Sequence, residues 1–280
     1  MTPDAVTPEP GAAPDPAELL ALAVDVAREA AALVARGRAT AGDHVAVKSS
    51  SVDVVTAVDT DSERLIVDRL TRARPGDGVL GEEGAARDGT SGVRWVVDPI
   101  DGTVNFLYGV PAYAVSIAAE VDGVVRAGAV LNVATGELFT ATSGGGAHLS
   151  SPARPEPVRL TGSSPVSLEQ TLVATGFGYR AEQRRAQGAV VARLLPQVRD
   201  IRRFGSAALD LCAAAAGRVD AYYELELHPW DHAAGALVAA EAALVVTGLP
   251  GRRFAEPMAI AAAASIAGPF VELLAGLHAG

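Results

Sequence analysis

Cysteine, lysine and aromatic residues are scarce in this sequence. The 280 residues contain one cysteine, Cys212, so the chain can form neither an intramolecular disulfide nor a cysteine-based zinc cluster. This composition fits a reducing cytoplasm, which is the expected location. Aromatic residues make up 5% of the chain, so the core has to be built mainly from alanine, valine and leucine. Lys48 is the single lysine. Codon bias toward GC explains the preference for arginine and the excess of alanine, but a lysine kept under this bias is informative, because arginine replaces lysine poorly where a compact ammonium group is needed.

The sequence also lacks a surplus of basic residues and a long apolar segment. Asp and Glu number 33 against 23 Lys and Arg, and the net charge of −10 argues against direct nucleic-acid binding. A phosphorylated ligand is not excluded, because acidic groups hold phosphate through divalent metals. Residues 1–16 have no secretory pattern and predict a disordered tail. Residues 258–277 contain Gly268, Pro269 and Glu272, and therefore predict a strand, a turn and a helix instead of a membrane span.

Hydrophobic periodicity changes along the chain. Residues 17–36 and 59–73 have helical spacing, whereas 94–148 reads as a series of strands joined by turns such as Asp122-Gly123. This middle stretch predicts an antiparallel meander. After the proline-rich residues 152–166 we expect strands at 172–174, 221–224 and 244–246, and helices at 183–195, 207–216 and 231–243. We therefore predict an α+β protein with an N-terminal half over 17–151 and a C-terminal half over 152–280.

The segment WVVDPIDGTVNF, residues 95–106, carries two carboxylates on a predicted strand-to-helix turn. A buried strand delivers Asp98 at its end. Pro99 keeps Asp98 extended, because the residue before a proline disfavours helix. The chain then turns, so that Asp98 and Asp101 can converge on one point. A capped turn with solvated aspartates is the alternative interpretation.

The residues between and after these aspartates add oxygen and nitrogen atoms to the same place. The Ile100 carbonyl has no obvious strand partner and is available as a further oxygen ligand. Gly102 and Thr103 begin a helical turn, and their amides would form an anion site at its N-terminus. Carboxylates beside such amides can hold metal ions against a phosphate.

Three further motifs are weak when each is taken alone. Glu82 and Glu83 lie in a glycine-flanked turn, GEEG at 81–84, which has the form of an ordinary surface turn. Asp59 and Asp231 stand near predicted helix starts, where a capping role explains them equally well. Asp231 would, however, add a carboxylate from the second half and complete a site between the halves.

Together these motifs resemble the inositol monophosphatase family of metal-dependent, lithium-sensitive phosphatases. The resemblance covers about residues 17–277 and rests on stretches whose order and spacing fit the family: KSSSVDVVTAVD (48–59), GEEG (81–84), WVVDPIDGTVNF (95–106), IRRFGSAALDLCAAAAGRVDAYYE (201–224) and WDHAAG (230–235). It implies a layered α/β/α/β/α sandwich of the inositol monophosphatase and fructose bisphosphatase type, with a mostly antiparallel first sheet.

The resemblance also implies two or three Mg²⁺ ions per site. Oxygen ligands suit Mg²⁺, and paired cations can activate a water molecule for in-line attack on phosphate without a covalent intermediate. The resemblance implies that Glu82, Asp98 and the Ile100 carbonyl bind the first ion, that Asp98, Asp101 and Asp231 bind the second, and that Glu82 binds a third. It implies catalytic roles for Asp59 and Thr103, with Glu82, and phosphate binding by Gly102 and Thr103. It further implies substrate contacts by Asp101, Ala207, Glu224 and Asp231, with Lys48 and Glu83 as polar support.

The expected reaction is the hydrolysis of a phosphorylated polyol, myo-inositol 1-phosphate, because Tyr222-Tyr223-Glu224 keeps an acidic position for binding hydroxyl groups. Sibling phosphatases act on histidinol phosphate, fructose 1,6-bisphosphate, adenosine 3′,5′-bisphosphate or NADP. A regulatory protein of transcription or ribosome assembly is the alternative of another class. The family further implies a homodimer. We expect no membrane segment and no direct nucleic-acid binding.

Some residues depart from the pattern or stay open. After the helix that carries Asp231 the family has a glycine pair, whereas this chain has Glu241-Ala242-Ala243-Leu244, so the helix has to end without the usual left-handed glycine. His228 and His232 have the spacing of a zinc pair, but Pro229 between them favours a role at the helix flank. Arg202-Arg203 is interpreted as a solvated or dimer-contact pair, with a substrate clamp as the alternative.

Overall fold

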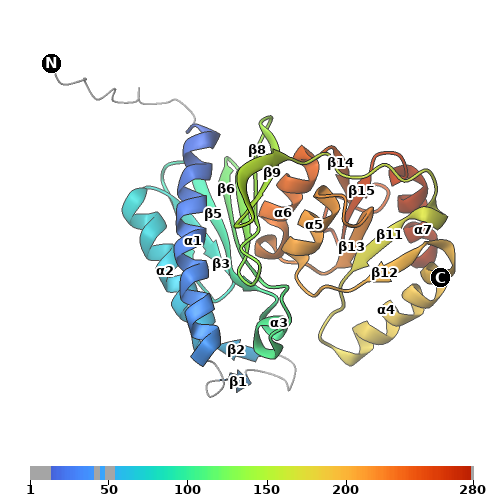
Figure 1. Cartoon of the computed structure of the whole chain (residues 1–280), viewed down its shortest axis with the longest axis horizontal. Helices are drawn as coiled ribbons and strands as arrows, with labels where there is room; N and C mark the ends of the chain where they lie inside the picture. The colour runs from blue at the N-terminus through green and yellow to red at the C-terminus, as the bar shows by residue number, and fades with distance from the viewer. Residues whose placement is uncertain (1–13, 41–44, 48–53, 279–280) are drawn as a thin grey trace.

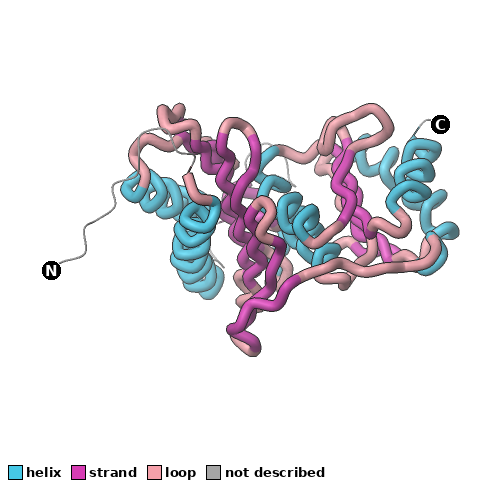
Figure 2. The backbone as a smooth tube through the Cα atoms, turned by 90° about the horizontal axis from the view of Figure 1, so that it is seen from above, coloured by secondary structure: helices cyan, strands magenta, loops and turns pink. Residues whose placement is uncertain are grey.

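The computed structural model describes residues 14–40, 45–47 and 54–278. Lys48 and residues 1–13 of the predicted tail lie outside these ranges. Five layers follow one another across the molecule: a helical layer, a large sheet, a pair of central helices, a smaller sheet and a second outer helical layer (Figures 1 and 2). The predicted α/β/α/β/α sandwich is therefore confirmed.

The helices of the three helical layers differ in how much of their surface is covered. The outer pair on one side is α1 (Pro16–Thr40) with α2 (Ala57–Ala73), the central pair is α5 (Ala207–Ala215) with α6 (Pro229–Glu241), and the outer pair on the other side is α4 (Ala181–Leu194) with α7 (Ala267–His278). All nine residues of α5 are buried, because this helix lies between two sheets. Alanine at most of its positions suits that crowded layer.

The first sheet has eight strands in the order β10-β9-β8-β7-β6-β5-β3-β4. Its neighbours pair antiparallel, except that β3 and β5 are parallel, which confirms the mostly antiparallel first sheet. The bounds are β3 (Gly78–Gly81), β4 (Ala86–Arg87), β5 (Val93–Asp101), β6 (Ala114–Val121), β7 (Val124–Asn132), β8 (Leu138–Thr142), β9 (Gly146–Ser151) and β10 (Arg154–Arg159). The sheet thus continues to Arg159, past the division expected at 151, and the two-half organisation stays a prediction.

The second sheet has five strands in the order β12-β11-β13-β15-β14, with β11 parallel to β12 and β13 and the other pairs antiparallel. Its strands are β11 (Leu172–Thr175), β12 (Asp200–Arg202), β13 (Ala221–Leu225), β14 (Leu244–Thr247) and β15 (Met258–Ala263). The short elements of the described residues are the antiparallel pair β1 (Val45–Val47) and β2 (Val54–Thr56), the six-residue helix α3 (Thr103–Tyr108), and two 3-10 helices, η2 (Leu168–Gln170) and η3 (Leu195–Gln197).

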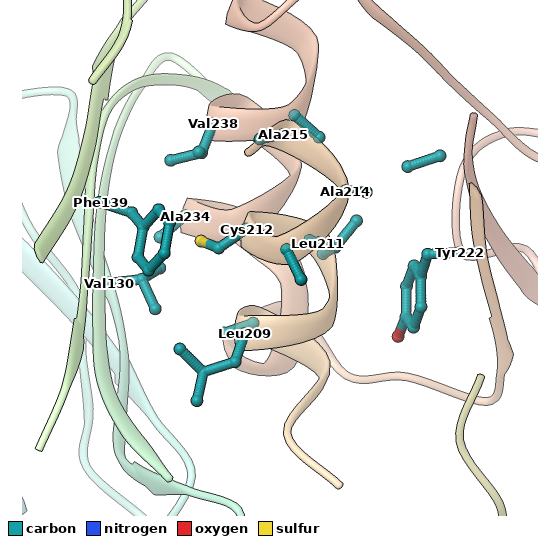
Figure 3. Packing of buried hydrophobic residues seen from close by; sticks show 14 of the residues in the cluster. Val130, Phe139, Leu209, Leu211, Cys212, Ala214, Ala215, Tyr222, Ala234 and Val238 are labelled. Carbon is teal, nitrogen blue, oxygen red and sulfur yellow. The ribbon is translucent and has the colours of Figure 1, made fainter. Parts of the chain in front are cut away.

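The described residues form three apolar clusters, one at each helical layer, and the central cluster contacts both sheets. The central cluster contains Cys212, which is fully buried, as expected for a structural thiol. In Figure 3 Cys212 points from α5 toward Phe139 of the first sheet, while Tyr222 of the second sheet lies on the opposite side of the helix. Burial raises the pKa of the Cys212 thiol well above its usual value, so it stays uncharged. Within the described ranges, no helix is both long and apolar enough to span a lipid bilayer.

Two helix ends differ from expectation. Helix α1 continues past residue 36, where the helical spacing ended in the sequence, and through Gly37 to Thr40. Gly37 serves close packing instead, because a Cβ atom there would lie 2.6 Å from a methyl carbon of Val58. At the end of α6 the left-handed conformation is kept without glycine: Ala243 has a φ of 65°. The chain thus lacks the glycine pair of the family at this helix end, but an alanine adopts the left-handed conformation in its place.

Candidate active site

A β-bulge in β5 brings the two aspartates of the central motif to one side. Asp98 pairs with Ser116 of β6 and Asp101 pairs with Ala114, so three steps along β5 match two along β6. In a regular strand, residues three positions apart point to opposite faces. The extra residue corrects this mismatch, and Pro99 lies inside the bulge, where a missing N–H does no harm. The convergence expected from a turn is thus produced by a bulged strand that runs on to Asp101.

Helix α3 begins directly after this strand. Gly102 has φ 94° and ψ 39°, and a Cβ atom there would lie 2.9 Å from the Ala112 carbonyl oxygen, so the position requires glycine. The Thr103 hydroxyl lies 3.1 Å from the Ile100 carbonyl oxygen and 3.4 Å from Asp59 Oδ2, so two acceptors compete for its single proton. The Ile100 carbonyl therefore has a hydroxyl neighbour but keeps a second lone pair.

Asp101 joins the first sheet to the central helices. Its Oδ2 accepts hydrogen bonds from the Ser206 hydroxyl at 2.5 Å and from the Ala208 N–H at 2.8 Å. The same Ser206 oxygen accepts from the Leu209 N–H at 3.3 Å and so caps α5. One carboxylate oxygen of Asp101 is thereby anchored at a helix N-terminus.

The second sheet and α6 supply the other two carboxylates. Oε2 of Glu224 accepts from the Tyr222 hydroxyl at 2.8 Å, and Oδ2 of Asp231 accepts from the His228 N–H at 2.7 Å. Asp231 thus has the capping role that the sequence left open, and its other oxygen has no hydrogen bond with the residues that the structure describes. A Cβ atom at Gly176 would lie 1.9 Å from Glu224 Oε1, so this glycine makes room for the carboxylate. One oxygen of Asp98 is also held by the backbone, because Oδ1 accepts from the Ile100 N–H at 3.0 Å.

One cleft of about 530 Å³ brings most of the predicted residues together. Its lining includes the following members of the predicted set: Glu82, Asp98, Ile100, Asp101, Gly102, Thr103, Ala207, Glu224 and Asp231. Asp59 is 1% exposed and lies behind Thr103. Glu83 is adjacent to the cleft through its neighbour Glu82 but does not line it.

The carboxyl groups of the cleft hold their protons unusually tightly. Burial raises the pKa of Glu82 to about 8, a hydrogen bond with Asp98 opposes this shift, and the charge of Asp231 adds to it. Burial likewise raises the pKa values of Asp101, Asp231 and Glu224 to about 7. The pKa of Asp98 is raised well above its usual value by burial and by the charge of Glu82. Acidic groups that raise one another's pKa in this way form a site that favours a cation.

The donor set fits a hard cation such as Mg²⁺, because it consists of carboxylate and carbonyl oxygens. Within the described residues, no three acidic, histidine or cysteine side chains already form a closed metal cage. Instead, one oxygen of Asp98, Asp101 and Asp231 is held by a protein donor.

Three residues of the site were not singled out in the sequence. Ser206 anchors Asp101, Tyr179 lines the cleft, and Asn105 donates to the carbonyl oxygens of Ala112 and Phe204, both at 2.7 Å, which ties α3 to the segment before α5. Of the arginine pair, Arg203 lines the cleft, where a substrate clamp would be, whereas Arg202 pairs with Asp200. A polar residue directly before an apolar helix could have indicated Ser206 as a cap.

Of the two histidines that have zinc-pair spacing, His228 lies at the helix flank, as expected, whereas His232 lies inside α6. His228 is the residue before α6, with Pro229 at the first helical position, and its ring stacks on Trp230. His232 contacts Phe254 edge to face, and burial lowers the pKa of His232 to about 4. The two rings thus have separate aromatic partners.

Comparison with known proteins gives a consistent result. A family model described as the inositol monophosphatase family matches residues 15–278. Inositol-1-monophosphatase SuhB of Mycobacterium tuberculosis is 50% identical, with 94% of each chain covered. Nus factor SuhB of Escherichia coli is 40% identical over 83% of this chain and 86% of its own. The solved structure of Mycobacterium tuberculosis SuhB has a TM-score of 0.81 and 46% identity, and covers 94% of this chain and 98% of its own.

Proposed function

This chain belongs to the inositol monophosphatase family, which makes it a phosphoric monoester hydrolase, and we propose that it converts myo-inositol 1-phosphate to myo-inositol and phosphate with Mg²⁺ as cofactor. The observation that carries the proposal is the meeting of Glu82, Asp98, Asp101 and Asp231, drawn from separate elements of the fold, in one cleft with Gly102 and Thr103. The relatives named inositol-1-monophosphatase support the choice of substrate.

We propose that Glu82, Asp98 and the Ile100 carbonyl hold one Mg²⁺ ion, and that Asp98, Asp101 and Asp231 hold a second. Bound Mg²⁺ neutralises phosphate oxygens and lowers the pKa of a bound water molecule. Because Asp98, Asp101 and Asp231 each have one oxygen fixed by a protein donor, their orientation is set before the ion arrives. A third ion at Glu82, a homodimer, a cytoplasmic location and inhibition by Li⁺ are parts of the same proposal.

Thr103 and Asp59 are the proposed pair for the attacking water. Thr103 lines the cleft, and its hydroxyl lies 3.4 Å from the buried carboxylate of Asp59. If the hydroxyl donates to Asp59, its oxygen can accept a hydrogen bond from water and orient the water toward phosphorus. As the water attacks, its proton can pass to the Thr103 oxygen while the hydroxyl proton passes to the Asp59 carboxylate. The N–H groups of Gly102 and Thr103 at the start of α3 are proposed to bind the phosphate.

The far side of the cleft is proposed to recognise the polyol. Glu224 keeps Oε1 free of hydrogen bonds with the described residues, whereas Oε2 accepts from Tyr222. An oxygen of this kind can accept hydrogen bonds from vicinal hydroxyl groups. Ala207 is 7% exposed at the start of α5, where a small side chain leaves room for the ring.

A phosphate-release screen tests this function. The purified chain is assayed with inositol 1-phosphate, histidinol phosphate, fructose 1,6-bisphosphate, adenosine 3′,5′-bisphosphate and NADP, each with Mg²⁺ and with excess chelator. We expect the highest kcat/KM for inositol 1-phosphate and no turnover in chelator. Full hydrolysis in chelator contradicts the metal mechanism, and a higher kcat/KM for a sibling substrate moves the assignment to that substrate.

A regulatory role is the second candidate, because a relative 40% identical to this chain is named Nus factor SuhB. Such a role requires a protein or nucleic-acid partner and does not require turnover. Pull-down at near-physiological salt, with the wild type and with Asp98→Asn, tests it. Equal recovery of transcription or ribosomal components by both proteins supports the role, and recovery of none rejects it.

A further inference from the structure

Glu63 is a buried carboxylate that the proposed reaction does not use. It lies on α2, is 6% exposed, and is held against the turn that follows β3. Its Oε2 accepts from the Glu83 N–H at 2.8 Å, and its Oε1 accepts from the Ala85 N–H at 2.9 Å. Both oxygens of one side chain thus bind the backbone on either side of Gly84.

The turn that Glu63 binds presents Glu82 to the cleft. The Gly81 N–H donates to the Ala85 carbonyl at 2.7 Å and closes the turn, while the Glu82 N–H donates to the Val97 carbonyl of β5 at 3.2 Å. Gly84 has a φ of 108°, a conformation that requires glycine. The turn is therefore fixed to β5 on one side and to Glu63 on the other.

The fit between Glu63 and this turn is close. A Cβ atom at Gly81 would lie 2.2 Å from Glu63 Oε2, so only a glycine at position 81 admits the carboxylate. The glycine before Glu82 thus makes room for Glu63, and the glycine after Glu83 allows the turn. The motif that resembled an ordinary surface turn has a buried partner 20 residues away in the chain.

Helix α2 contacts three segments of the site: the Glu82 turn, the bulge that follows Asp98, and the start of α3 with Thr103. Asp59, Ser62 and Glu63 are all buried and share one helix face, since they are separated by three and four positions. Asp59 accepts from the Thr103 hydroxyl at 3.4 Å. Ser62 donates to the Pro99 carbonyl at 3.4 Å, and Glu63 binds the turn that follows Glu82. One rigid helix therefore sets the position of the Glu82 turn relative to the bulge that carries Asp98.

We propose that Glu63 is a positioning residue that holds the Glu82 turn in place and thereby sets the affinity of the site for Mg²⁺. The inference rests on the proposed function, because Glu82 has to be a ligand. Glu63 itself touches neither the substrate nor the ion. Glu63 restricts the motion of Glu82 before the ion binds, so Glu82 loses less conformational entropy on binding. Residues that support a metal ligand raise metal affinity in this way.

Two substitutions separate positioning from charge. Glu63→Gln keeps the size but replaces one acceptor oxygen with an NH₂ group that faces a backbone N–H. Glu63→Asp keeps the charge but shortens the side chain by one methylene, so it can no longer reach both N–H groups. If only the charge matters, the aspartate variant binds metal as the wild type does; if positioning matters, both variants bind it more weakly.

The chain provides a matched control in Glu241. This carboxylate at the end of α6 also accepts from two backbone N–H groups, those of Gly144 at 2.7 Å and Gly146 at 2.9 Å, in a hairpin that does not line the cleft. Glu241→Gln therefore removes the same kind of double hydrogen bond without touching the Glu82 turn. Its effect on the melting temperature measures the purely structural cost.

The experiment measures Mn²⁺ binding by electron paramagnetic resonance and Mg²⁺ binding by calorimetry in the four proteins, with circular dichroism as the folding check. We expect the metal Kd to rise about 10–100-fold in Glu63→Gln and Glu63→Asp and to stay unchanged in Glu241→Gln. The Mg²⁺ concentration for half-maximal hydrolysis should rise in parallel, with kcat at saturating Mg²⁺ close to that of the wild type. Unchanged metal binding in folded Glu63→Asp overturns the proposal, even if Glu63→Gln fails to fold. Wild-type protein that binds neither ion overturns the proposed function itself, which is a separate result.

Discussion

Asp101 and Ser206 are 105 positions apart in the chain and share a hydrogen bond of 2.5 Å. The bond joins the end of β5 to the N-terminus of α5, and the Ser206 oxygen also caps that helix. One hydroxyl therefore orients a predicted metal ligand and satisfies the start of a buried helix. The relationship links the stability of the central layer to the geometry of the cleft.

Ser206→Ala should lower both stability and activity. It removes the cap and leaves the buried Asp101 oxygen with one donor fewer, so we expect the free energy of unfolding to fall by about 1–3 kcal/mol. Urea denaturation measures the loss, and phosphate release measures the activity. Thr71→Ala, which removes a hydroxyl that donates to the Val67 carbonyl on α2, is the control. Equal small losses in both variants would show that the Asp101 contact contributes nothing.

Asp98→Asn should leave the fold intact and nearly abolish turnover. The substitution keeps the shape of the side chain but removes the charge that is proposed to bridge two ions, so we expect kcat to fall at least about 100-fold. Asp61→Asn on the exposed surface of α2 is the control for removal of one acidic charge. Phosphate release at saturating Mg²⁺ is the measurement. Wild-type activity in Asp98→Asn would remove this residue from the metal site.

Glu224→Gln should change substrate preference without disabling hydrolysis. The neutral amide accepts hydrogen bonds from hydroxyl groups more weakly, and we expect kcat/KM for inositol 1-phosphate to fall by the equivalent of about 1–3 kcal/mol. A small aryl phosphate has no such hydroxyls and should be hydrolysed nearly as before. An equal loss for both substrates would place Glu224 in the catalytic or structural machinery, and no loss for either would remove it from substrate recognition.

The metal-free protein should lose stability as the pH rises from about 4 to about 8. The carboxyl pKa of Glu82 is about 8 and those of Asp101 and Asp231 are about 7 in the folded chain, against ordinary values of 4.5 and 3.8. Between these limits the folded state binds more protons than the unfolded state, so the free energy of unfolding decreases with pH. Mg²⁺ binds the ionised groups and should reverse the trend.

Thermal denaturation in chelator and in Mg²⁺ at several pH values checks this dependence. The melting temperature in chelator is expected to fall through this range, and the stabilisation by Mg²⁺ is expected to grow. Asp231→Asn should flatten the pH profile, because one titrating group is gone. A stabilisation by Mg²⁺ that is the same at low and high pH would contradict proton release from these carboxyl groups.

Ala243→Gly should stabilise the protein. Ala243 has a φ of 65°, and a left-handed conformation costs an alanine more than a glycine. We expect a gain of about 0.5–1 kcal/mol, after allowance for the greater freedom of glycine in the unfolded chain. Ala242→Gly at the preceding position, where φ is −90°, is the control and should lower stability. The urea midpoints of the two variants decide the matter, and a lower midpoint for Ala243→Gly would contradict the expected relief.

The part of the fold that depends on neighbouring residues could be predicted from the sequence. The turn at Asp122-Gly123, with φ values of 51° and 77°, follows from residues that tolerate the left-handed region. The helices end within a few positions of the expected places, because their apolar periodicity and their breakers are local. The strand-to-helix segment at 95–106 was recognisable for the same reason.

Contacts between distant residues could not be predicted in this way. The Asp98–Asp101 bulge is defined by its register against β6, and the acidic turn at 82–85 is held by Glu63 from a separate helix. The sequence by itself determined which residue types were available for a metal-dependent phosphatase, and the short segments that carry them. Only the tertiary structure decided which oxygens are fixed and which remain available, because hydrogen bonds such as Ser206 to Asp101 form when two sheets and the helices between them pack together.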